Sequence, residues 1–110
     1  HKKLSTYQFS LENEKVLQSQ IEEALIKERV TYAREYFLDE HNIIDFLAGD
    51  GVGIEVKIQG SKRSIYTQIL KYSTFKEIQS VLLVTNKNIG NPPLYEGKKL
   101  IILNLGAAWL

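Results

Sequence analysis

NIIDFLAGDGVGIEVKIQ, residues 42–59, contains two apolar segments separated by Gly49-Asp50-Gly51. Two glycines around an aspartate are typical of a tight turn between paired strands. We therefore predict a β-hairpin with strands over residues 42–48 and 52–59. On the second strand, Glu55 and Lys57 alternate with apolar residues and project from one face.

Periodic apolar residues on either side of the hairpin extend the prediction to the whole chain. An amphipathic helix is expected from a Ser10 N-cap to about Lys27, followed by a strand over residues 30–38. After the hairpin, residues 63–78 predict a second helix. SVLLVT (residues 80–85) predicts a strand buried on both faces, and residues 99–105 predict a last strand. The order helix, three strands, helix, two strands predicts an α/β domain with a mixed central sheet, in which a meander is followed by a crossover helix leading to an inner strand.

Composition limits the class of protein. The 110 residues suffice for one domain, which we place at residues 10–110 after an N-terminal extension (residues 1–9) that is either a cloning remnant or a shortened terminus. The chain has no cysteine and no apolar run of membrane-spanning length, so we expect an intracellular, cytoplasmic protein without a membrane partner. Fourteen basic and thirteen acidic residues give a net charge of +1, which neither supports nor excludes binding to nucleic acid.

Two acidic residues occupy positions where the pattern calls for apolar ones. Glu14 falls in the middle of the apolar stripe of the first helix, as an inward carboxylate or as a helix-start acid favoured by the dipole. Asp45 is the only charge in Ile43-Ile44-Asp45-Phe46-Leu47. It lies either at a strand end that reaches water or in a functional site, because burying an unpaired carboxylate is costly.

The segment Glu55-Val56-Lys57 has the form acid-x-lysine, which a surface ion pair would explain equally well. Glu96-Gly97-Lys98 has the same form, but only the first follows an apolar strand with an aspartate. On the second helix, Gln68 and Tyr72 are one turn apart on the apolar face. A glutamine there could satisfy a buried backbone group, and a tyrosine there is common in a core.

Together these segments resemble the PD-(D/E)xK, or restriction-endonuclease-like, nuclease superfamily over about residues 12–105. The RecB-like pattern is matched by Ile43-Ile44-Asp45, by Glu55-Val56-Lys57, and by Gln68 and Tyr72 at a Gln-x-x-x-Tyr spacing. Glu14 is similar to the first-helix acid of Holliday-junction resolvases and virus-type replication-repair (VRR-NUC-like) nucleases. The chain departs from the pattern in Asn42, where RecB-like members often have glycine, and in lacking the proline of the superfamily name.

The resemblance implies a fold of order αβββαβ(β), a Mg²⁺ or Mn²⁺ cofactor and a set of site residues. Asp45 and Glu55 would be the primary metal ligands, joined by the Val56 carbonyl, and Glu14 would hold the ion through water or bind a second ion in a two-metal site. Lys57 would orient the attacking water or stabilise developing charge, with Gln68 hydrogen-bonded nearby. Phosphate contacts would come from Lys62, Arg63 and Tyr72, although Tyr72 could instead support the site.

The expected function is metal-dependent hydrolysis of DNA, by an endonuclease acting on branched or structured DNA as a homodimer or within a larger nuclease complex. A nuclease of a mobile-element or restriction-type defence system, cutting duplex DNA, is an alternative. A non-catalytic nucleic-acid-binding or assembly module on the same fold is another. Glu35 could face the same cleft but has ordinary surface neighbours, and His41 is expected to be a turn residue rather than a ligand.

Overall fold

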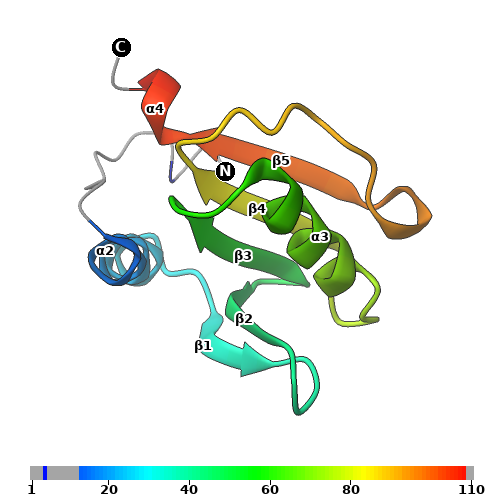
Figure 1. Ribbon diagram of the computed structural model, residues 1–110. Helices are drawn as coiled ribbons and strands as arrows, with labels where there is room; N and C mark the ends of the chain where they lie inside the picture. Colours follow the sequence, from blue (N-terminus) through cyan, green and yellow to red (C-terminus); the bar gives the residue numbers. More distant parts are fainter. Residues whose placement is uncertain (1–3, 5–12, 109–110) are drawn as a thin grey trace.

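The protein is a five-stranded sheet with one helix on each face, as the computed structural model shows (Figure 1). Residue 4 and residues 13–108 are described. The strands are β1 (Tyr32–Phe37), β2 (Ile43–Ala48), β3 (Val52–Lys57), β4 (Ser80–Thr85) and β5 (Lys99–Asn104). The helices are α2 (Glu14–Lys27), α3 (Lys62–Ser73), the short α4 (Leu105–Ala108) and the 3-10 turn η1 (Tyr95–Gly97). This order confirms the predicted α/β class with a mixed sheet.

The sheet has the order β1-β2-β3-β4-β5, with neighbours in sequence also neighbours in space. The first three strands form an antiparallel meander, and the predicted hairpin pairs Ala48 with Val52 across the turn. β4 runs parallel to β3 and β5 runs parallel to β4. Because parallel strands need a crossover, α3 carries the chain across one face between β3 and β4. The inner position predicted for residues 80–85 is therefore confirmed.

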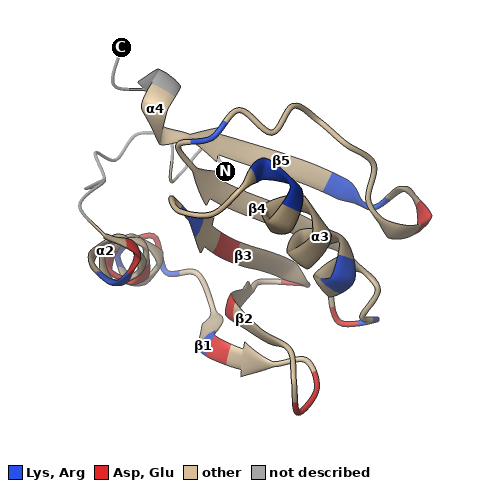
Figure 2. Cartoon of the chain, in the orientation of Figure 1, with Lys and Arg blue, Asp and Glu red and all other residues tan. Residues whose placement is uncertain are grey.

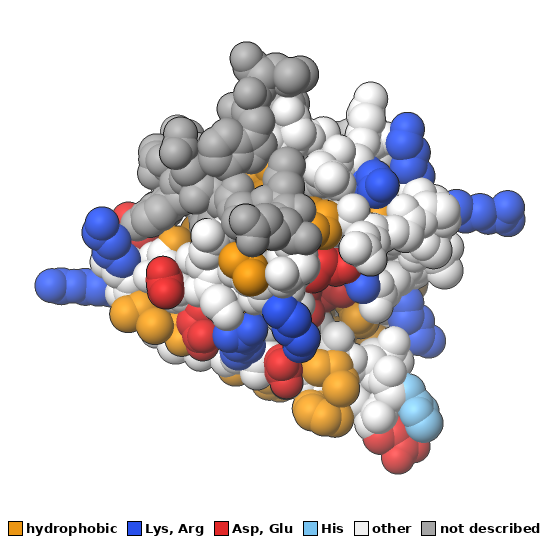
Figure 3. All heavy atoms as spheres, turned by 60° about the vertical axis from the view of Figure 1, so that its left-hand side comes forward, with side chains coloured by type: hydrophobic (Ala, Val, Ile, Leu, Met, Phe, Trp, Pro, Cys, Tyr) orange, Lys and Arg blue, Asp and Glu red, His pale blue; other side chains and the backbone are white. Residues whose placement is uncertain are grey.

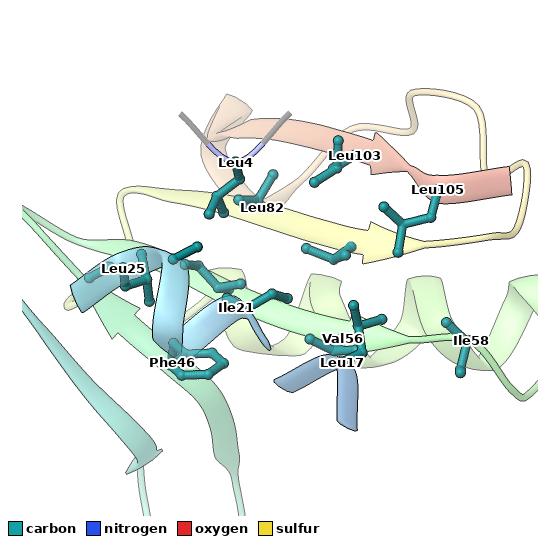
Figure 4. Packing of buried hydrophobic residues seen from close by; sticks show 14 residues of the cluster. Leu4, Leu17, Ile21, Leu25, Phe46, Val56, Ile58, Leu82, Leu103 and Leu105 are labelled. Atoms are coloured by element: carbon teal, nitrogen blue, oxygen red, sulfur yellow. The ribbon is translucent and has the colours of Figure 1, made fainter. Parts of the chain in front are cut away.

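Two apolar cores lie on opposite faces of the sheet. The core under α2 is drawn in Figure 4, where Leu17 and Ile21 of the helix meet Phe46 and Val56 of the sheet. Leu4, within the segment treated above as an extension, is also buried there. The core under α3 contains, among others, Ile44, Ile65, Ile69, Tyr72, Val81 and Leu83. Both faces of the central strands are therefore covered, which explains their continuous apolar sequence.

The helix boundaries differ from those predicted. The Asn13 side chain accepts a hydrogen bond from the Val16 N–H and caps α2, so the helix begins at Glu14, while Ser10 lies outside the described residues. α3 ends at Ser73, five residues before the predicted end at Ile78. The Thr74 hydroxyl bonds the Lys71 carbonyl, and successive turns then direct Ile78 into the core. None of the described helices is both long and apolar enough to cross a bilayer.

Candidate active site

The candidate site forms at the point in β2 where successive core side chains change from one face of the sheet to the other. Two residues apart on a regular strand share a face, yet Ile44 packs in the core under α3 and Phe46 packs in the core under α2. Asp45 lies between them. Its expected partner on β1 is Glu35, which has φ of 53° and makes no pair in the ladder, and pairing of β2 with β3 begins only at Phe46 and Ile54. Both ladders are thus interrupted at Asp45.

Side chains replace the missing ladder bonds at this point. The Asp45 N–H donates to Glu55 Oε1 at 3.1 Å, and the Val56 N–H donates to Asp45 Oδ2 at 2.8 Å. Each acid therefore accepts a hydrogen bond from the backbone of the neighbouring strand. This exchange satisfies amides that would otherwise be left without a partner where the strands separate, and it brings the Asp45 and Glu55 carboxyl groups together.

The two carboxyl groups are buried and electrostatically coupled. Glu55 is only 2% exposed, and burial followed by the negative charge of Asp45 raises its pKa to about 8. Burial also raises the pKa of Asp45, against the opposing effects of the Val56 N–H and of Lys57. The side chains are hydrogen-bonded to each other as well, and that bond favours the proton on Glu55. Two such groups cannot both ionise without cost, so the pair retains a proton at neutral pH.

Lys57 and Glu14 complete the charged surroundings of the pair. The Lys57 ammonium lies 3.7 Å from Glu55 Oε2, at the end of β3, and it is partly exposed. Glu14, in the first turn of α2, is half-buried, and its pKa is raised by burial and modulated by the charges of Lys57 and Asp45. Glu14 therefore lies on the side of the helix predicted from its place in the apolar stripe, within electrostatic range of both residues.

Gln68 and Tyr72 lie behind the acid pair and bond to each other. Gln68 Nε2 donates to the Tyr72 hydroxyl at 2.7 Å, and that hydroxyl donates to the Ile43 carbonyl at 2.9 Å. Tyr72 is 2% exposed, and burial followed by the charges of Glu55 and Asp45 raises its pKa. This burial favours support of β2 over a phosphate contact. Gln68 is expected to hydrogen-bond near Lys57 or near the attacking water. Among the described contacts its amide group bonds Tyr72, and no bond joins it to Lys57.

Two site residues, Gln18 and Arg34, were not identified from the sequence. Gln18 is buried on α2 between Leu17 and Ile21, and its side chain donates to the Asp45 carboxylate. Arg34 on β1 bonds Gln18 Oε1 at 3.4 Å and Glu22 at 2.8 Å. A polar residue inside the apolar stripe was the available signal for Gln18. No feature of the neighbouring sequence identifies Arg34 as a site residue, because its contacts depend on how α2 crosses the sheet.

The remaining predicted residues lie around this centre. Lys62 and Arg63 are exposed in the first turn of α3, a helix that carries basic residues and no acidic one (Figure 2). Glu35 is exposed and lies 3.9 Å from Lys15, as a surface residue would. His41 lies in the turn before β2, where Asp39 accepts its backbone N–H, and its side chain is exposed. The prediction that His41 is a turn residue is confirmed.

The described residues supply a carboxyl pair rather than a preformed cage for a metal ion. Within residues 13–108 no three histidine or acidic side chains are close enough together to hold one ion. The space-filling view shows acidic side chains (red) next to a basic one (blue) near the middle of one face (Figure 3). The contacts of Asp45, Glu55 and Lys57 make these residues a compact charged centre, and Glu14 does not complete a group of three acids with the pair.

Comparisons with known proteins found no matching family model, no matching curated protein and no matching solved structure. The assignment of a function therefore depends on the geometry and chemistry of the site.

Proposed function

We propose that this protein is a metal-dependent nuclease of the restriction-endonuclease-like class, which hydrolyses phosphodiester bonds in DNA. The observation that carries the proposal is the pairing of Asp45 with Glu55 where β2 and β3 separate, with the Lys57 ammonium 3.7 Å from Glu55. An acid pair with an adjacent cation at a strand divergence is expensive to bury for structural reasons alone. Perturbed titratable groups of this kind concentrate in functional sites.

The chemistry of the acid pair fits a hard divalent cation. Carboxylate oxygens are the ligands that Mg²⁺ and Mn²⁺ prefer, and a divalent charge would offset the repulsion that raises the pKa of Glu55. Asp45 and Glu55 would hold the ion, with the Val56 carbonyl and, through water, Glu14. When bound, such an ion neutralises phosphate charge and makes bound water more acidic.

The side chains around the pair have distinct roles. Lys57 holds a positive charge beside Glu55, where it orients the attacking water or stabilises the negative charge that develops on the phosphate. Tyr72 fixes the Ile43 carbonyl, two residues before Asp45, and Gln68 fixes the Tyr72 hydroxyl. Gln18 and Arg34 orient Asp45 from the opposite side. These contacts restrict the acid pair to one geometry, as catalysis by positioning requires.

Branched or otherwise structured DNA is the substrate that we propose. The protein would recognise the shape of the DNA, as a homodimer or within a larger complex. The alternative, a defence nuclease that cuts linear duplex DNA, would use the same site residues and would differ from a branched-DNA nuclease only in its substrate.

A cleavage assay tests the proposal. Labelled four-way junction, flap, single-stranded and linear duplex DNA are incubated with wild-type protein and Mg²⁺ or Mn²⁺, and with EDTA. Asp45→Asn should lose cleavage on every substrate, whereas Asp50→Asn, a matched change in the exposed hairpin turn, should retain it. The substrate cut fastest distinguishes the branched-DNA function from the defence function. Metal-independent cutting, or equal activity of the two variants, would contradict the proposed site.

The hydrogen bonds that the acid pair accepts from the backbone favour one other function, a non-catalytic module. In that case Asp45 and Glu55 serve to stabilise the interrupted ladder. The same assay then gives no cleavage with any metal, while Asp45→Asn unfolds more readily than wild type because it weakens the acceptor for the Val56 N–H.

A further inference from the structure

A groove lined by polar and basic residues lies along the exposed side of α3, near the start of β2. Its volume is about 590 Å³, and its walls include Asn42, just before β2, and Arg63, Thr67, Gln68 and Lys71 of α3. None of the described residues that line it is acidic or aromatic. The groove is therefore distinct in composition from the centre of buried carboxyl groups.

Two cations in the groove have no acidic partner in the part of the chain that the structure describes. Arg63 and Lys71 are exposed, and no ion pair joins either of them to an acid among the described residues. By contrast, Lys57 and Arg34 each lie against a glutamate elsewhere in the fold. α3 contains no acidic residue at all, as the cartoon coloured by charge shows (Figure 2). The groove thus presents a positive field that no described acidic residue neutralises by an ion pair.

The spacing of these cations along the helix suits a ligand with a chain of anionic groups. Arg63, Thr67 and Lys71 follow each other at intervals of four residues, so they lie on one face of the helix. At a rise of about 1.5 Å per residue, Arg63 and Lys71 are about 12 Å apart along the axis. With this separation along the helix, each cation can contact a different phosphate of an extended strand.

Hydrogen bonds of Gln68 link the groove to the strand that carries Asp45. Gln68 lines the groove, and its amide donates to Tyr72, which bonds the Ile43 carbonyl of β2. A strand lying in the groove would contact Asn42, three residues before Asp45. Because none of the described lining residues is aromatic, contacts to the phosphate backbone are favoured over stacking of bases.

We infer that this groove binds one strand of the DNA substrate through its phosphates, with Arg63 and Lys71 neutralising two of them and leading the strand to the acid pair. The direction of the strand rests on the proposed nuclease function, whereas the binding itself does not. Since the contacts are to phosphates, binding is independent of base sequence and decreases with salt.

Binding is measured by fluorescence anisotropy with a labelled single-stranded oligonucleotide, in EDTA to prevent cleavage, over a series of salt concentrations. The double variant Arg63→Ala/Lys71→Ala should bind at least about tenfold more weakly at low salt. Its salt slope should be smaller than that of wild type by about 1.4, the value for two phosphate contacts on a single strand. The matched control Lys27→Ala/Lys99→Ala removes the same charge from exposed positions on α2 and β5 and should stay within about twofold of wild type.

Equal losses in the two double variants, an unchanged salt slope, or no binding of DNA by wild type would overturn the inference. Displacement of the oligonucleotide by polyglutamate as effectively as by unlabelled DNA would also overturn it, because the groove would then be a site for acidic protein segments. Failure of this inference can be distinguished from failure of the proposed function. If the double variant weakens DNA binding but the wild type shows no metal-dependent cleavage, the groove inference stands and the nuclease function is contradicted. If the wild type cleaves DNA and the double variant cleaves it equally well, the nuclease function stands and the groove inference is contradicted.

Discussion

The Gln18 side chain donates a hydrogen bond to the Asp45 carboxylate, and its own oxygen is held by Arg34 at 3.4 Å. An amide can rotate so that either its oxygen or its nitrogen faces a neighbour, but the Arg34 guanidinium can only donate. The contact with Arg34 therefore fixes the Gln18 nitrogen toward Asp45. Glu22, 2.8 Å from Arg34, holds the guanidinium in place in turn.

Replacement of Gln18 should weaken binding of a divalent cation. Gln18→Leu keeps the approximate volume but removes the donor to Asp45, and loss of such a supporting contact typically reduces metal affinity about 10- to 100-fold. Titration with Mn²⁺, followed by calorimetry, measures the change. Ser19→Ala, an exposed neighbour on α2, should bind as wild type does. Unaltered affinity in Gln18→Leu would mean that Asp45 needs no such positioning.

Lys57→Ala should abolish most cleavage without unfolding the chain. The ammonium lies beside Glu55 and is partly exposed, so its removal costs little packing. Loss of one group that stabilises the transition state typically lowers kcat about 100- to 1000-fold. Single-turnover cleavage, with circular dichroism to verify folding, measures both effects. Lys99→Ala on β5 removes an exposed lysine far from the acid pair and should retain full activity, and a Lys57→Ala protein as active as this control would remove the proposed role.

The stability of the metal-free protein should fall as pH rises, because of Glu55. Its pKa is raised from an ordinary 4.5 to about 8 in the folded chain by burial and by the charge of Asp45. Between these values the folded chain keeps the proton and the unfolded chain releases it, so the stabilisation present below pH 4.5 is lost as pH rises through about 8. The free energy of unfolding should therefore decrease by up to roughly 5 kcal/mol across this range.

Urea denaturation at several pH values, in EDTA, measures this loss. Glu55→Gln has no proton to release, so it should show a flatter profile and exceed wild type in stability at the upper end of the range. Glu23→Gln, at an exposed position on α2, should follow the wild-type profile. A Glu55→Gln profile parallel to that of wild type would show that another group causes the pH dependence.

Tyr72→Phe should destabilise the protein by about 1–3 kcal/mol, because it leaves the Ile43 carbonyl and the Gln68 amide without the partner they share. The side chain is almost fully buried, so water cannot take the place of the hydroxyl without rearrangement. Tyr95→Phe, at an exposed position, should change stability by less than about 0.5 kcal/mol. Thermal or urea unfolding compares the two, and equal stabilities would show that the Tyr72 hydroxyl does not support β2.

The sequence predicted the element order well because apolar periodicity reports burial directly. Residues 80–85 are buried on both faces, and the predicted strand has the observed bounds. The predicted end of α3 was too late, because the turns that follow Ser73 direct Ile78 into the core and so extend the apolar pattern beyond the helix. At the site, Asp45 and Glu55 were recognised as misplaced acids. The left-handed backbone of Glu35, which opens the ladder beside Asp45, has no signature because a non-glycine residue rarely adopts it.

The backbone amides of Asp45 and Val56 donate hydrogen bonds to carboxylate oxygens instead of to carbonyl oxygens of a neighbouring strand. The resonance of an amide proton depends on the charge and distance of its acceptor, so these two NMR signals should move whenever the acid pair gains a proton or a cation. Amides bonded to carbonyls elsewhere in the sheet lack that sensitivity. The interrupted ladder therefore gives the site a built-in spectroscopic reporter, through which its charge state can be followed in the unmodified protein without any substrate.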